Sequence, residues 1–127
     1  MSKKKILNYW NLRAGKKILK CTNDINLENN EISIFLSIIK NKKNVLDIGC
    51  GDGELLRNLK KKNKCNCYGI DFSQNLIREA KKRSKNINYY CIDMNKIKKE
   101  FKVKKKFDYI ITKRSIQNLT SWNDQKK

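Results

Sequence analysis

Three glycines and an aspartate with useful chemistry are concentrated in the segment VLDIGCGDGELL, residues 45–56. Asp47 lies in its apolar first part, and Gly49, Gly51 and Gly53 then occupy every second position. Glycines allow the backbone to close around a ligand because no Cβ stands in the way. The amphipathic stretch 54–62 follows directly, so N–H groups at the start of a helix would point at the same place. This segment therefore predicts a site for a nucleoside-containing cofactor.

The glycine spacing argues against a dinucleotide. The dinucleotide fingerprint G-x-G-x-x-G would place its third glycine at position 54, which is a glutamate. The pattern is instead D-x-G-x-G-x-G, and Asp52 lies in the turn that would face a pyrophosphate. An acidic turn suits a ligand that lacks phosphate and carries positive charge. The segment resembles motif I of the class I S-adenosylmethionine-dependent methyltransferases, whose donor is a sulfonium with an ammonium group and no phosphate.

A second acid follows the next apolar segment. Residues 65–73 (CNCYGIDFS) read as a strand that ends at Asp71, close to the ~20-residue spacing after Gly49 at which an acid binds ribose hydroxyls. A carboxylate there can accept hydrogen bonds from both hydroxyls. The alternative is that Asp71 or Ser73 only caps the following helix, whose inner face would contain Leu76 and Ile77.

A third acid follows the segment INYYCI, residues 87–92, which predicts another strand. Asp93 could accept a hydrogen bond from an exocyclic amine, and Met94 could offer an apolar surface and a backbone N–H to a purine. These positions match the adenine site of the methyltransferase family. Taken alone, Asp93 would be read as a cap or a turn residue.

A fourth strand is predicted at residues 107–112, and the loop after it is similar to the family loop beside the donor's methionine portion. Asp108 at the beginning of this strand is interpreted as structural. Arg114, Gln117 and Asn118 are candidate substrate contacts. Many family members have a histidine near position 118, and its absence here removes one candidate base.

The resemblance implies a role for each motif position. Asp47 would orient the methionine end, the glycines would allow close backbone approach, Asp71 would hold ribose, and the remaining positions would surround adenine. The expected S-adenosylmethionine site consists of Asp47, Gly49, Cys50, Gly51, Gly53, Asp71, Phe72, Asp93, Met94 and Thr112. We assign no catalytic base and no metal ligand.

These elements predict an α/β fold, a Rossmann-like parallel sheet with strand order 3-2-1-4 and flanking helices. The complete methyltransferase fold has seven strands and this sequence supplies four, so we expect an incomplete fold that stops after the fourth strand. That strand would be an exposed edge, which leaves oligomerisation open. The acceptor-binding part would be missing, so the activity of this chain alone is in question.

The N-terminal residues 1–44 are expected to form a helical arm, and residues 45–127 the donor-binding domain. Ile6, Tyr9 and Trp10 fall at helical spacing, and the arm could be a lid over the cofactor or an aromatic staple on the body. A second helix is expected to begin near Glu31, capped by Asn29 or Asn30. Its apolar stripe would consist of Ile32, Phe35, Leu36 and Ile39.

Composition limits the remaining possibilities. The 127 residues suffice for one domain, and the sequence contains five cysteines, no histidine and no apolar run of the ~20 residues that a membrane span needs. We therefore expect a reduced, cytoplasmic protein without metal. The net charge of +19 fits either a solvated surface or a nucleic-acid footprint. In a parallel α/β fold, the Lys-rich clusters 60–64, 81–85 and 102–106 would lie at the edge opposite the ligand.

Acidic residues give the opposite pattern. Asp47, Asp52, Glu54, Asp71 and Asp93 would gather at the carboxyl edge of the sheet and make a locally negative pocket. The function expected from these features is methyl transfer from S-adenosylmethionine to a small-molecule acceptor. The alternatives are an RNA methyltransferase recruited by the lysine-rich surface, a non-catalytic donor-binding fragment, and a dinucleotide-binding module.

Overall fold

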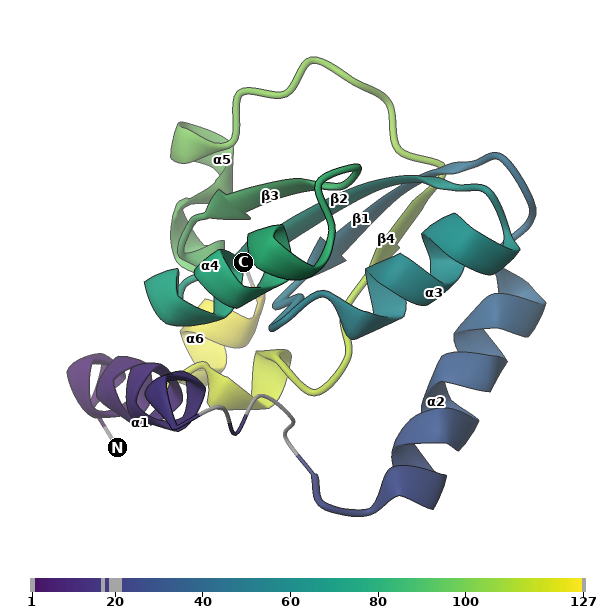
Figure 1. The fold of residues 1–127 in the computed structure, drawn as a ribbon. Coiled ribbons are helices and arrows are strands. Elements are labelled where there is room, and N and C mark those ends of the chain that lie inside the picture. Colours follow the sequence, from purple (N-terminus) through teal and green to yellow (C-terminus); the bar gives the residue numbers. More distant parts are fainter. Residues whose placement is uncertain (1, 17, 19–21, 127) are drawn as a thin grey trace.

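A single four-stranded sheet forms the centre of the computed structural model, which describes residues 2–16, 18 and 22–126 (Figure 1). The strands are β1 (Asn44–Ile48), β2 (Asn66–Asp71), β3 (Asn88–Cys91) and β4 (Tyr109–Ile111). They are all parallel and lie in the order β3-β2-β1-β4, with Asp47 in register with Gly69 and Ile111. The predicted sheet order 3-2-1-4 is therefore confirmed.

Helices connect and flank these strands. The four longer ones are α1 (Lys3–Gly15), α2 (Ile25–Ile38), α3 (Glu54–Lys62) and α4 (Gln74–Arg83). The short ones are η1 (Met94–Lys96), α5 (Ile97–Glu100), η2 (Ile116–Asn118) and α6 (Trp122–Lys126). None of the helices in the described ranges is long and apolar enough to cross a membrane.

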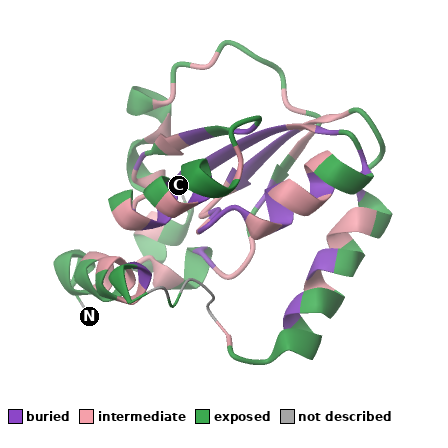
Figure 2. Ribbon diagram, viewed as in Figure 1, coloured by how far each residue is buried: buried purple, intermediate pink, exposed green. Residues whose placement is uncertain are grey.

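The main core lies between the sheet and the helices α2, α3 and α4. Leu56 and Leu59 of α3 are fully buried against Val45, Cys67 and Ile77, as the amphipathic pattern of residues 54–62 predicts. Burial of one such leucine side chain contributes roughly 1.5–3 kcal/mol. Figure 2 shows this buried layer as the purple strands and inner helix faces. The core fixes the glycine-rich turn because α3 begins directly after it.

An aromatic segment covers the other face of the sheet. Phe107 contacts Tyr68 edge-to-face at 5.3 Å between ring centroids, and Phe101 contacts Tyr90 in the same way. Leu46 and Ile70 are buried beneath this cluster. Ile110 of β4 remains 64% exposed, so the aromatic cover ends before the outer strand.

Helix α2 begins earlier than the sequence predicted. Its N-cap is Asp24, whose carboxylate accepts a hydrogen bond from the Leu27 N–H at 3.0 Å, and its first residue is Ile25. The predicted start near Glu31 with a cap at Asn29 or Asn30 is wrong, because Asp24 satisfies the N-terminal N–H groups one and a half turns earlier. The apolar stripe is confirmed, with Ile32 and Ile39 buried and the other two members partly buried.

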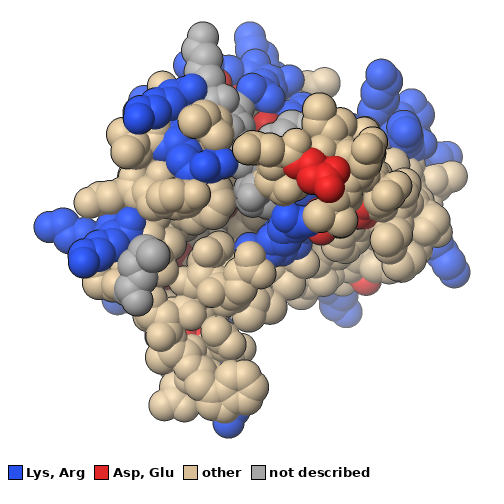
Figure 3. All heavy atoms as spheres, turned by 90° about the horizontal axis from the view of Figure 1, so that it is seen from below, with Lys and Arg blue, Asp and Glu red and all other residues tan. Residues whose placement is uncertain are grey.

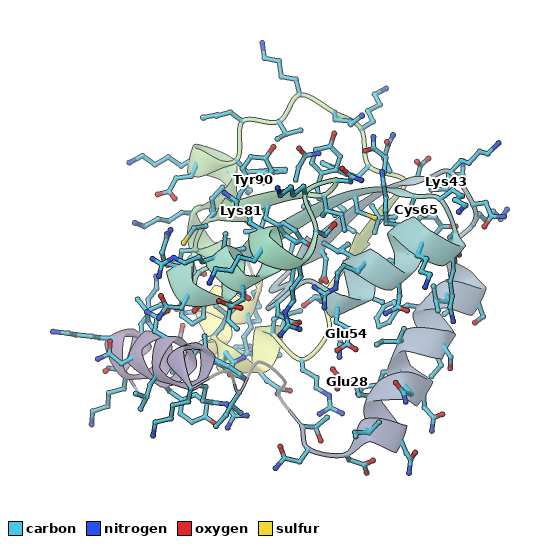
Figure 4. All side chains as sticks on the ribbon, viewed as in Figure 1. Glu28, Lys43, Glu54, Cys65, Lys81 and Tyr90 are labelled. Atoms are coloured by element: carbon cyan, nitrogen blue, oxygen red, sulfur yellow. The ribbon has the colours of Figure 1, made fainter. Side chains whose placement is uncertain are left out.

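Asp108 closes the N-terminal edge of the sheet. Its Oδ2 accepts a hydrogen bond from the Asn44 N–H at 2.8 Å, and Lys43 lies 3.5 Å from Oδ1. The backbone hydrogen bond and the nearby lysine lower the pKa of Asp108. Its structural interpretation is confirmed. Lys43 and Cys65 mark this edge of the sheet in Figure 4.

The described cysteines carry free thiols. Cys65 and Cys67 are buried in the main core, Cys50 is buried in the glycine-rich turn, and Cys91 is exposed. Burial is the main factor that raises the pKa of Cys67 to about 12, so this thiol is unreactive at neutral pH. Cys21 lies outside the described residues.

Candidate functional site

A cavity of about 350 Å³ opens at the carboxyl ends of the strands, where the four β-ends meet α1 and the loop after β4. The cavity wall includes most of the residues that the sequence predicted for donor binding. These are Asp47, Gly49, Cys50, Gly51, Asp71, Phe72, Asp93 and Met94. The structure therefore brings three successive strand ends to one cavity.

Two predicted positions lie away from this wall. Thr112 is exposed, one residue beyond the end of β4, and its hydroxyl is hydrogen-bonded to the hydroxyl of Ser115. Gly53 precedes α3, and a Cβ there would collide with the Tyr89 side chain. Gly53 thus allows β3 to pack against the turn. The pattern of alternate glycines could not separate this packing requirement from ligand approach.

The glycine-rich turn is held against the end of β2. The N–H groups of Gly49 and Cys50 donate to the Ile70 carbonyl at 2.7 and 2.9 Å. Gly51 has a φ of 56°, its N–H donates to Asp71 Oδ2 at 3.0 Å, and a Cβ there would meet only open space. At Gly49, by contrast, a Cβ would collide with Ser115. Gly51 is thus the glycine around which the cavity leaves room for a ligand.

Asp47 places an unpartnered carboxylate oxygen in the cavity wall. The residue is 2% exposed, and its Oδ1 has no hydrogen-bond partner within the part of the chain that the structure describes. Burial raises the pKa of Asp47 to about 7; the neighbouring Asp71 raises it further, and Lys113 acts in the opposite direction. A buried polar atom without a partner is costly. The site is therefore suited to a ligand that brings a hydrogen-bond donor, and a cationic donor best.

Asp71 is fixed by backbone hydrogen bonds. Its Oδ1 accepts from the Ser73 N–H at 2.8 Å, and its Oδ2 accepts from the Gly51 N–H. Burial raises the pKa of Asp71, while these hydrogen bonds lower it. The cap of α4 is Ser73, whose hydroxyl accepts from the Leu76 N–H. Of the two residues considered as caps, Ser73 therefore performs that role, and Asp71 joins the turn to β2.

Asp93 already has two partners. It caps η1 by accepting a hydrogen bond from the Asn95 N–H at 3.0 Å, and it is paired with Lys3 of α1. The cap that the sequence left open is therefore present. Lys3 joins the cavity wall beside Asp93 and Met94. No sequence pattern connects Lys3 with Asp93, because the pair depends on how α1 docks.

The expected negative pocket is partly neutralised. Asp52 contacts Arg57 at 3.4 Å and Arg83 at 3.0 Å, and Lys113 and Arg114 belong to the cavity wall. The prediction that the whole 81–85 cluster lies at the opposite edge is wrong for Arg83, whose long side chain reaches back to the turn. Within the described residues, Asp47 and Asp71 are the acids of the strand ends that have no ion-pair partner.

Two acids of α2 bind the loop after β4. Lys113 lies 3.7 Å from Glu28 and 3.5 Å from Glu31, and Arg114 contacts Glu31 at 2.6 Å. Glu28 is buried and faces the same region as Glu54 at the start of α3 (Figure 4). The sequence analysis missed Glu28, Glu31 and Lys113 because each looks like an ordinary surface charge in its own segment.

Helix α1 supplies the remaining wall. It lies on α4, where the Ser73 hydroxyl donates to Asn11 Oδ1 at 2.6 Å and the Asn75 amide donates to the Asn11 carbonyl at 3.0 Å. From this position Ile6 and Trp10 reach the cavity. The helix thus both packs on the body, as the staple interpretation predicted, and borders the site.

A protein-family model described as a methyltransferase domain matches residues 39–126. A ubiquinone biosynthesis O-methyltransferase of Coxiella burnetii is 32% identical over 116 residues. The alignment includes 88% of this chain and 46% of that protein. The chain thus spans about half the length of the curated relatives it matches.

Solved structures show the same fold. The complex of the Haloferax volcanii Trm112 methyltransferase activator with a putative methyltransferase matches with a TM-score of 0.70 and 14% identity, over 91% of this chain and 51% of that chain. A TehB-like S-adenosylmethionine-dependent methyltransferase of Corynebacterium glutamicum matches with a TM-score of 0.67 and 20% identity, over 97% and 62% of the two chains. Together with the family model, the sheet order and the motif at residues 45–56, these likenesses place the chain in the class I S-adenosylmethionine-dependent methyltransferase family.

Proposed function

We propose that the cavity at the carboxyl edge of the sheet binds S-adenosylmethionine and presents its methyl group to an acceptor. The observation that carries this proposal is the unpartnered Oδ1 of Asp47, buried in a cavity wall that also contains Gly51 and Asp71. An ammonium group can supply the missing hydrogen bond and balance the carboxylate charge. A pyrophosphate would bring negative charge to the same place.

Each strand end has a proposed part in donor binding. Asp71 would accept hydrogen bonds from ribose hydroxyls, since a carboxylate has more acceptor positions than its two backbone partners use. Phe72, Asp93 and Met94 would surround the adenine ring. Asp93 would keep its bond to the Asn95 N–H while a base amine competes with Lys3 for its other oxygen.

The donor's sulfonium makes its methyl group electrophilic before the protein acts on it. The part of this chain is to position the reactants and to exclude water. Asp47 and the Gly51 turn would fix one end of the donor, and Ile6 and Trp10 of α1 would screen the cavity from solvent. We assign no residue as a base.

The acceptor that we propose is a small molecule. The curated relative is named for O-methylation in ubiquinone biosynthesis, and the present chain aligns with about half of that protein. An RNA acceptor is the alternative that the charge of +19 suggests. On the face with α1 and α2, however, basic side chains lie in separate groups and not in one continuous stripe (Figure 3). A donor-binding module without activity of its own is the third candidate.

Calorimetry with S-adenosylhomocysteine and, separately, NAD tests donor binding directly. We expect the full chain to bind the former and not the latter. Asp47→Asn should weaken S-adenosylhomocysteine binding about tenfold, because it removes a buried charge–charge interaction while keeping the side-chain shape. Glu100→Gln is the matched control, since Glu100 pairs with Lys96 away from the cavity and should leave affinity unchanged. Binding of NAD alone would reject the proposal.

Methyl transfer requires a separate measurement. Incubation of the chain with methyl-labelled donor and cell extract should label a small molecule, and ribonuclease treatment should leave that label intact. Label that disappears with ribonuclease would favour the RNA alternative. Donor binding without any labelled product would favour the non-catalytic module.

A further inference from the structure

A second cavity, of about 360 Å³, lies beside the first between α1 and η2. This is ample for a small organic molecule, since a cavity of roughly 150 Å³ can hold benzene. Its wall consists of Ile6, Tyr9, Trp10, Gln117, Asn118, Leu119 and Thr120. Several of these residues also belong to the wall of the first cavity, so the two cavities adjoin.

The second cavity differs from the first in its chemistry. Tyr9 and Trp10 lie edge-to-face, with 5.2 Å between ring centroids, and Ile6 and Leu119 add apolar surface. Its polar groups are the amides of residues 117 and 118 and the hydroxyl of Thr120. None of the wall residues that the structure describes is charged. The first cavity, by contrast, contains acids and bases from five segments of the chain.

Arg13 is the cation that the structure records nearest to this aromatic pair. Its guanidinium carbon lies 5.3 Å from the Tyr9 ring centroid and 5.8 Å from that of Trp10. These distances are typical of cation–π contacts, in which the positive charge lies against the ring faces. Arg13 is absent from the wall residues of either cavity, so it supports the rings from outside.

We propose that the second cavity is the acceptor site and that it selects an uncharged aromatic molecule of about one ring, bearing a hydroxyl group. The proposal deepens the proposed function and rests on it, because an acceptor must lie beside the methyl donor. An ionised acceptor would lose hydration without gaining a counter-ion from this wall. The rings of Tyr9 and Trp10 offer stacking surface, and the amides and Thr120 can exchange hydrogen bonds with a hydroxyl.

The charges around the first cavity support the same choice. Lys3, Lys113 and Arg114 are its basic wall residues, and each is paired with an acid of the chain. A phosphate group would therefore compete with carboxylates for these cations. An RNA nucleotide would have to enter the uncharged second cavity with its backbone close to Asp47 and Asp71, where like charges repel.

Fluorescence of Trp10 provides the test. The chain contains two tryptophans, and Trp122→Phe leaves Trp10 as the reporter while removing a side chain that is 68% exposed. Catechol, phenyl phosphate and an RNA oligonucleotide would each be titrated into this variant, with and without saturating S-adenosylhomocysteine. We expect a saturable change in emission with catechol, and an affinity for phenyl phosphate at least about tenfold weaker because that probe brings charge into an apolar wall.

Two variants with a matched control locate the binding. Tyr9→Ala should weaken catechol about fivefold, the loss expected for an aromatic contact. Leu12→Ala changes an exposed residue of the same helix outside both cavities and should have no effect. Gln117→Glu, also exposed, should shift preference from catechol to the cationic tyramine about tenfold, because it places one carboxylate in the wall.

The outcomes separate this inference from the proposed function. If S-adenosylhomocysteine binds and catechol does not, or if Tyr9→Ala and Leu12→Ala behave alike, the acceptor assignment is wrong and donor binding stands. If phenyl phosphate or the oligonucleotide binds more tightly than catechol, the acceptor class is wrong. If catechol binds as described and S-adenosylhomocysteine does not, the aromatic site stands and the proposed donor site is wrong.

Discussion

Arg114 binds Glu31 across 83 positions of sequence, and this pair ties the loop after β4 to α2. The guanidinium donates from Nε at 2.8 Å and from Nη2 at 2.6 Å to the same Glu31 oxygen. Arg114 has a φ of 58°, an uncommon value for a residue with a Cβ. The pair therefore holds a backbone conformation that places Lys113 and Ser115 on the cavity wall.

A double-mutant cycle should measure this pair. We expect Glu31→Gln, Arg114→Gln and the double variant to give a coupling free energy of about 1 kcal/mol in chemical unfolding, because the pair is only about a quarter exposed and the arginine makes two charge-assisted bonds. The exposed Lys96–Glu100 pair is the control and should give less than about 0.5 kcal/mol. Equal coupling for both pairs would contradict the role given to Arg114.

Donor affinity should depend on pH through Asp47. Its pKa is raised to about 7, mainly by burial, so the carboxylate is protonated over most molecules below that pH. A cationic ligand binds the ionised form, and its affinity should rise by up to about tenfold per pH unit between pH 5 and 7 and then level off. Calorimetry with S-adenosylhomocysteine across this range measures the slope. Asp47→Asn should abolish it, and an unchanged slope in that variant would assign it to another group.

Lys113 should set the position of this pH profile. Its positive charge lowers the pKa of Asp47, opposing the effects of burial and of Asp71. Lys113→Gln should therefore move the rise in affinity to higher pH. Lys98→Gln, an exposed lysine of α5, is the control and should leave the profile in place. A shift toward lower pH in Lys113→Gln would show that its charge does not act on Asp47.

The glycines of the turn should separate binding from stability. Gly51→Ala strains a positive φ but meets open space, so it should cost about 1 kcal/mol of unfolding free energy and reduce donor affinity more than tenfold by filling the cavity. Gly53→Ala collides with the Tyr89 side chain and should cost several kcal/mol. Thermal unfolding and calorimetry on both variants distinguish these effects. A Gly51→Ala protein that binds the donor normally would remove this turn from the site.

The docking of α1 should respond to a single amide. Asn11→Ala removes the partners of Ser73 and Asn75, and hydrogen exchange in α1 should become faster while the sheet amides keep their protection. Asn58→Ala, which removes an amide bond within α3, is the control and should leave α1 exchange unchanged. If exchange in α1 is the same in the Asn11 variant, the helix is held by other contacts, such as the packing of Trp10 against Leu76.

The strand order and the three strand-end acids could be predicted because their signals are local. An apolar run followed by glycines or an acid fixes where a parallel strand ends, and parallel strands end at one edge. The amphipathic pattern around Leu56 and Leu59 gave the inner face of α3 for the same reason. Asp24 is a local signal too, but two asparagines nearer the apolar stripe were chosen as caps in its place.

The ionic wall of the cavity could not be predicted in this way. Glu28 and Lys113 lie far apart in sequence, and each has the pattern of a solvated surface residue. Their contact depends on how α2 and the loop after β4 pack against the sheet edge. The pairing of Lys3 with Asp93 likewise depends on where α1 lies on α4. Such pairs need the tertiary arrangement, because charge alone has no preferred partner along the chain.

Amide NMR of the full chain, titrated with S-adenosylhomocysteine, tests the central claim most directly. The account predicts that the largest chemical-shift changes occur at Gly51, Phe72 and Met94, which belong to three different strand ends on one cavity wall. It predicts no change at Lys43 and Cys65, at the opposite edge of the sheet. Shifts confined to that opposite edge, or a spectrum that does not change at saturating ligand, would contradict it.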